Sequence, residues 1–101
     1  MKTWEELQVL VRTVMDGYGE RFDIRPSSDW YRLKLQEEFG ELVQSYLVAS
    51  GQTRKKETDS TVAKEKLADE FADVVSFLFL FAEHEGIDIR EAIERKWGKH
   101  L

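Results

Sequence analysis

Two stretches of this chain repeat one pattern of apolar and acidic residues, and this repeat constrains the fold more than any other feature. The first is LQEEFGELVQSYL, residues 35–47, and the second is LADEFADVVSFLF, residues 67–79. In both, apolar residues recur at steps of three and four, which predicts two amphipathic helices of the same design. Each helix would present acidic side chains beside an apolar stripe that packs on a core.

The remainder of the chain also reads as helix. Thr3 and Glu6 have the spacing of a capping box, and Ser27 or Ser28 and Asp88 can cap two later helices. The glycines at 17 and 19 predict a loosened end to the first helix, and no segment alternates as a strand does. We expect an all-α protein of four helices, near residues 3–18, 28–50, 61–85 and 88–97.

Composition supports a single globular domain over residues 1–101. Apolar residues make up 42% of the chain and charged residues 35%, and the length is sufficient for a core. The net charge of −5 argues against binding to a nucleic acid polymer. The acidic start of the chain lacks the apolar core of a signal peptide, and the longest apolar stretch, residues 74–82, is too short to span a membrane. We therefore expect a cytoplasmic protein.

The segment FADVVSFLFLFA, residues 71–82, is apolar on nearly every side. A helix on the outside of a monomer needs one wet face, and here only Asp73 and Ser76 supply it. This favours a four-helix bundle that is completed by oligomerisation, as a homodimer or homotetramer, because monomers rarely expose large apolar patches. The alternative is that this helix lies at the centre of a monomer.

The acidic residues of the repeat have the spacing of a metal site. Glu38 with Glu41, and Glu70 with Asp73, are three residues apart, so each pair shares one side of its helix. If the two helices pack together, the four carboxylates face one another and repel unless a cation lies between them. Oxygen ligands alone suit Mg²⁺, with Mn²⁺ as a second choice, and Mg²⁺ often takes substrate phosphates as further ligands.

Two other interpretations of these acids compete with a magnesium site. Acidic pairs at this spacing are common on solvated helix faces, and the acids would then only keep the protein soluble. A di-iron or di-manganese bundle would use Glu-x-x-His, whereas this chain has Glu41 and Asp73 where the histidines would be. The second interpretation is therefore disfavoured, and the first stays open.

Three segments together resemble one family. KLQEEFGEL (34–42), LADEFADVV (67–75) and GIDIREAIERKW (86–97) are similar to the MazG-like nucleotide pyrophosphohydrolases of the all-α NTP pyrophosphatase superfamily. The hallmark of that family is E-x-x-E, a spacer and E-x-x-D. The resemblance implies an oligomeric helical bundle that uses Mg²⁺ to cleave nucleoside triphosphates to monophosphate and pyrophosphate, often to remove non-standard nucleotides.

The resemblance also implies roles for individual residues. It assigns Glu38, Glu41, Glu70 and Asp73 to the metal and Lys96 to substrate phosphate. Glu37 and Glu38 are the candidate catalytic residues. Glu37 lies one turn before Glu41, where it could act as a base on the attacking water or contact a water bound to the metal. Lys34 is a further candidate for binding phosphate, and Trp30 for stacking on the base, although aromatic residues at helical spacing are more often core.

Three functions from different classes remain open after this step. The first is the nucleoside triphosphate pyrophosphohydrolase. The second is a relative that acts on another phosphorylated metabolite, such as the phosphoribosyl-ATP of histidine synthesis. The third is a non-catalytic dimeric helical module. The basic run Arg54, Lys55 and Lys56 falls in the polar segment 51–62, where we expect a solvated loop.

Overall fold

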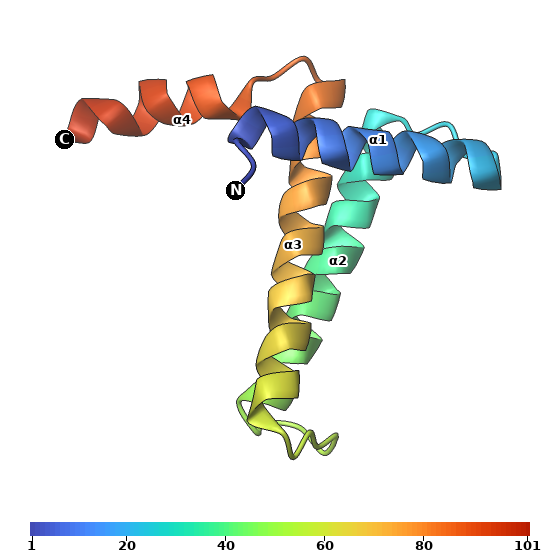
Figure 1. Ribbon diagram of the computed structural model, residues 1–101, viewed down its shortest axis with the longest axis vertical. Coiled ribbons are helices and arrows are strands. Elements are labelled where there is room, and N and C mark those ends of the chain that lie inside the picture. Colours follow the sequence, from blue (N-terminus) through green and yellow to red (C-terminus); the bar gives the residue numbers. More distant parts are fainter.

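The computed structural model describes residues 1–101 and is entirely helical (Figure 1). The predicted four helices without a strand are confirmed. They are α1 (Trp4–Phe22), α2 (Ser28–Ala49), α3 (Ser60–His84) and α4 (Ile89–Trp97), followed by a short 3-10 turn, η1 (Gly98–His100).

The helix boundaries follow the capping signals in the sequence. The backbone N–H of Glu6 donates to Thr3 Oγ1 over 3.1 Å and that of Thr3 donates to Glu6 Oε1 over 2.9 Å, which completes the capping box. The Ser27 side chain accepts from the backbone N–H of Trp30 and caps α2, and the Asp88 side chain accepts from that of Glu91 and caps α4. Gly51 and Gly86, with φ of 73° and 71°, adopt the left-handed conformation that follows a helix end.

The first helix ends later than the sequence predicted. It passes through both glycines and continues to Phe22, and the left-handed residue that stops it is Asp23, with φ 53°. Gly19 is needed for a different reason. The chain folds back at this point, so a Cβ at Gly19 would lie 2.9 Å from the carbonyl oxygen of Ile24. The glycine therefore permits a close backbone approach inside the turn and does not end the helix.

The helices form an open arrangement (Figure 1). The second and third pair as an antiparallel hairpin, the first crosses one end of it, and α4 extends away from it. The radius of gyration is 16.0 Å, whereas a compact domain of this length has roughly 13 Å. A single chain therefore does not close a four-helix bundle.

The core lies where α1 crosses the hairpin. Met15, Tyr31 and Leu80 are buried there, and the ring of Trp4 packs edge-on against Phe79 at 4.6 Å. Arg12 forms two hydrogen bonds with Glu83 across the same junction. Only 8 of the 101 residues are buried, so the core of a single chain is smaller than its length led us to expect. The reason is that an open hairpin covers only one side of each helix.

Part of the apolar surface of α3 is covered by no other helix, so this part is exposed. Phe71, Val75 and Leu78 are 42–54% exposed. Their counterparts in the repeat, 32 residues earlier, are equally open: Phe39, Val43 and Tyr46. None of the helices combines the length and the apolar character that crossing a membrane would require.

Candidate metal centre

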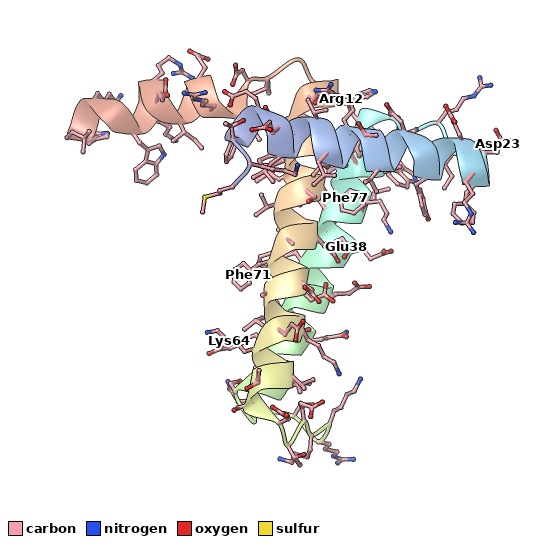
Figure 2. The ribbon with its side chains drawn as sticks, viewed as in Figure 1. Arg12, Asp23, Glu38, Lys64, Phe71 and Phe77 are labelled. Carbon is pink, nitrogen blue, oxygen red and sulfur yellow. The ribbon has the colours of Figure 1, made fainter.

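The structure brings together the acidic residues that the repeat predicted. Carboxylate oxygens of Glu38, Glu70 and Asp73, one from α2 and two from α3, all lie within 4.8 Å of one another. A second group at the same spacing consists of Glu37, Glu38 and Glu41. Glu38 belongs to both groups and so lies at the centre of the site (Figure 2). The convergence arises because α2 and α3 pack side by side along the acidic part of the repeat.

Two oxygens of the site are buried without a hydrogen-bond partner. They are Oε2 of Glu38 and Oε2 of Glu70, which come from opposite helices. Glu38 as a whole is only 8% exposed. A buried carboxylate oxygen without a donor costs free energy, and a divalent cation between the two helices would remove that cost. The donor set, oxygen only, fits Mg²⁺ or Mn²⁺.

The acids hold protons more tightly than isolated carboxyl groups do. Burial, followed by the nearby Glu41 carboxyl, raises the pKa of Glu38 to about 7. Burial and then the charge of Asp73 raise the pKa of Glu70, and burial and then the charge of Glu41 raise the pKa of Asp73. Acids with raised pKa values therefore converge here from two facing helices.

Lys34 and Glu37 form an ion pair at the edge of the site. The Nζ atom of Lys34 is 2.7 Å from Glu37 Oε1 and 3.9 Å from Glu38 Oε1. The hydrogen bond with Glu37 raises the pKa of Lys34. This lysine is the one cation that touches the acidic cluster within the chain.

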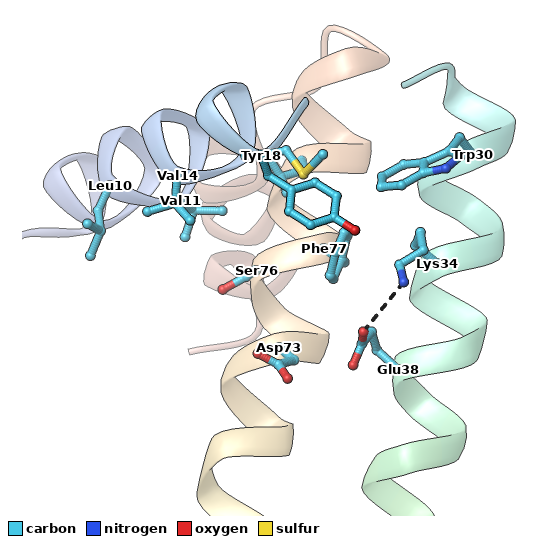
Figure 3. Close-up of a pocket in the computed structure, with 12 residues that line it drawn as sticks. Leu10, Val11, Val14, Tyr18, Trp30, Lys34, Glu38, Asp73, Ser76 and Phe77 are labelled. Carbon is cyan, nitrogen blue, oxygen red and sulfur yellow. Dashed lines mark ion pairs between the residues drawn. The ribbon is translucent and has the colours of Figure 1, made fainter. Parts of the chain in front are cut away.

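A cavity of about 490 Å³ opens beside the cluster, between α1 and the hairpin (Figure 3). Glu38 and Asp73 lie at one side of it, and most of the remaining wall is apolar. Its size falls in the roughly 300–1,000 Å³ range of small-molecule sites. Trp30 lines this cavity, where its ring is 5.4 Å from Tyr31 and 6.2 Å from Phe77. Trp30 and Lys34 therefore lie where the sequence placed them, next to the acids.

One wall of this cavity was not predicted from the sequence. Five residues of α1 line it, namely Leu10, Val11, Val14, Met15 and Tyr18. Their helical spacing indicated an ordinary core face, and nothing in that pattern distinguishes a core face from the wall of a cavity. The cavity could have been predicted only from an apolar face of α1 that extends beyond the core residues it covers.

Lys96 is not part of this arrangement. It lies on α4, which extends away from the hairpin, and it lines neither the apolar cavity nor any other large one (Figure 1). The contact that ties α4 to α1 is an ion pair between Arg90 and Glu5. The structure therefore does not bring Lys96 to the carboxylates of its own chain.

Comparison with protein-family models, with curated proteins and with solved structures finds no match to this chain. The resemblance to the MazG-like pyrophosphohydrolases stays a prediction that rests on the motif residues themselves.

Proposed function

We propose that this protein is a Mg²⁺-dependent nucleoside triphosphate pyrophosphohydrolase that releases nucleoside monophosphate and pyrophosphate. The observation that carries the proposal is the pair of buried, unpartnered carboxylate oxygens of Glu38 and Glu70, which face each other from two helices beside an apolar cavity. Such a site suits a divalent cation, and the apolar cavity beside it suits a flat apolar group. A nucleotide with its metal ion supplies both.

The residues that would hold the cation are Glu38, Glu41, Glu70 and Asp73. When bound there, Mg²⁺ would neutralise negative charge that develops on the phosphates during cleavage. Mn²⁺ has the same preference for oxygen ligands and would replace it.

The chain's own groups would orient the other reactants. Glu37, at 57% side-chain exposure, can accept a proton from the water that attacks phosphorus. Pyrophosphate leaves as its bond to the attacked phosphorus breaks. Lys34 holds Glu37 in place through their ion pair. The indole of Trp30 is positioned in the apolar cavity to stack on the base. Turnover of non-standard nucleotides, as cellular house-cleaning, would follow from a cavity with few polar groups to discriminate between bases.

The assembly we propose is a homodimer or a homotetramer. The exposed apolar residues of α2 and α3, together with Ile93 and Trp97 of α4, are those a helical bundle normally buries. A second copy packed on the hairpin would cover them. Sedimentation analysis should therefore find a dimer or larger species, and F71K should shift it towards monomer. A wild-type monomer at micromolar concentration would refute this assembly.

A panel of nucleoside triphosphates tests the activity. We expect pyrophosphate release with Mg²⁺ or Mn²⁺ and none with a chelator, and we expect Mg²⁺ to raise the melting temperature. The absence of both turnover and metal-dependent stabilisation would leave the acids as surface charge and refute the enzyme.

A further inference from the structure

A second cavity, which we call the basic cavity after its three lysines, lies at the opposite end of the acidic cluster. It has a volume of about 310 Å³ and is formed where the loop between α2 and α3 returns to the hairpin. Three lysines line it, Lys55 and Lys56 from the loop and Lys66 from α3. Glu41 and Glu70, which belong to the metal centre, form its inner edge.

The lysines of this cavity are largely free to bind an anion. Lys55 and Lys56 form no ion pair within the chain, and Lys66 has one partner, Glu57, at 3.6 Å. The Lys66 side chain is 66% exposed, so that pair is weak and easily exchanged. The other two acids on the wall, Glu41 and Glu70, are those that a divalent cation would neutralise. The cavity has three lysines and three glutamates, and a cation held by Glu41 and Glu70 would shift this balance towards positive charge.

The two cavities follow one another along the same side of the hairpin. On α2 the lining residues are Lys34 and Glu38 at the apolar cavity, then Glu41, Ser45 and Val48 at the basic one. These positions recur at steps of three and four and so lie on one helix face, with about 16 Å between Lys34 and Ser45 along the axis. The carboxylates stand between the two cavities.

We propose that the basic cavity is the subsite for the distal phosphates of the substrate, which Lys55, Lys56 and Lys66 bind. This inference rests on the proposed function and adds a direction to it. The base lies towards α1, the metal centre holds the reacting phosphate, and the leaving pyrophosphate points towards the loop.

The opposite orientation is unfavourable. The apolar cavity has one cation, Lys34, which already contacts Glu37 and Glu38. A polyphosphate placed there would lose its hydration against apolar side chains without compensating partners. The segment 51–62, expected from the sequence to be only a solvated loop, therefore gains a binding role.

Binding of inorganic tripolyphosphate tests the subsite without requiring turnover. Titration calorimetry on the full chain with Mg²⁺ should show binding by the wild type. The K55A/K56A and K66A variants should each weaken it roughly five- to tenfold, as expected for the loss of exposed lysine contacts to a charged group. K64A is the matched control, because Lys64 is an exposed lysine on α3 that lines neither cavity (Figure 2).

The kinetic counterpart separates the subsite from the activity. With a nucleoside triphosphate, the lysine variants should raise KM and weaken inhibition by pyrophosphate by the same factors, while a nucleoside monophosphate should inhibit all variants equally. If the wild type hydrolyses the substrate and the lysine variants behave like K64A, the subsite is refuted and the proposed function stands. Tripolyphosphate binding that depends on the lysines, without any turnover, would support the anion subsite and refute the hydrolase.

Discussion

The apolar and the basic cavities differ in what surrounds them, although both are walled by the same two helices. Glu38 and Asp73 face the apolar cavity, at the end where α1 adds its aliphatic side chains. Glu41 and Glu70 face the basic cavity, at the end where the loop adds its lysines. The repeat supplies two acids to each cavity. The difference between the two cavities therefore comes from α1 at one end of the hairpin and from the loop between α2 and α3 at the other.

Substitution of the acids that lie between the two cavities should have the largest effect. We expect E38Q and E70Q to lower pyrophosphate release by at least about a hundredfold, because each removes a charge that the cation requires. The same variants should lose the stabilisation by Mg²⁺ while keeping the wild-type helical circular dichroism. Near-normal activity in either variant would show that the cation is held elsewhere.

In the absence of a divalent cation, the stability of the folded chain should depend on pH. The pKa of Glu38, about 7 in the folded protein, lies above its ordinary value of 4.5. The folded chain therefore binds more protons than the unfolded chain between these values, so the free energy of unfolding falls as pH rises through this window. Glu38 alone would contribute a fall of about 3 kcal/mol between about pH 5 and pH 8.

Urea unfolding in the presence of chelator measures this effect. E38Q should lose most of the pH dependence, since its amide does not titrate, and Mg²⁺ should restore stability more at the alkaline end of the range. An unfolding free energy that is flat with pH in the metal-free wild type would indicate that Glu38 is solvated.

Exchange of single residues at the two ends should separate their roles. W30A should raise KM for nucleoside triphosphates roughly tenfold, because it removes a stacking surface for the base. It should leave tripolyphosphate binding unchanged. K66A should instead weaken the binding of tripolyphosphate. A nucleoside without phosphates should bind to K66A as tightly as to the wild type. Equal effects of both variants on both ligands would show that the two cavities do not divide base from phosphate.

The fold was predictable wherever the signal was local. Capping by Thr3 and Asp88 and the position of each acidic pair on one side of its helix depend on residues a few positions apart, and the structure confirms them. The end of α1 was not predictable in this way. Gly19 is required by a backbone contact with Ile24 across the turn, which no spacing rule reveals.

The site was predictable in part for the same reason. The repeat identified the carboxylates because their spacing on each helix fixes their direction. The loop lysines could not be assigned, because a charged run without periodicity carries no direction until the chain returns to the hairpin. Lys96 differs from the loop lysines, because a resemblance in sequence assigned it to the substrate. Its position depends on the direction of α4, which extends away from the hairpin.

Lys96 therefore gives the smallest expected effect and a sharp control on the comparison. We expect K96A to change KM for nucleoside triphosphates by less than about twofold, the usual range for an exposed residue away from a site. The same lysine-to-alanine change at Lys66 should produce the much larger rise described above. If K96A instead matched K66A, then α4 would have to reach the carboxylates in the assembled protein, either by moving or from a second copy. The distal phosphates would then be shared between the loop and α4, and the basic end of the hairpin would be incomplete in a single chain.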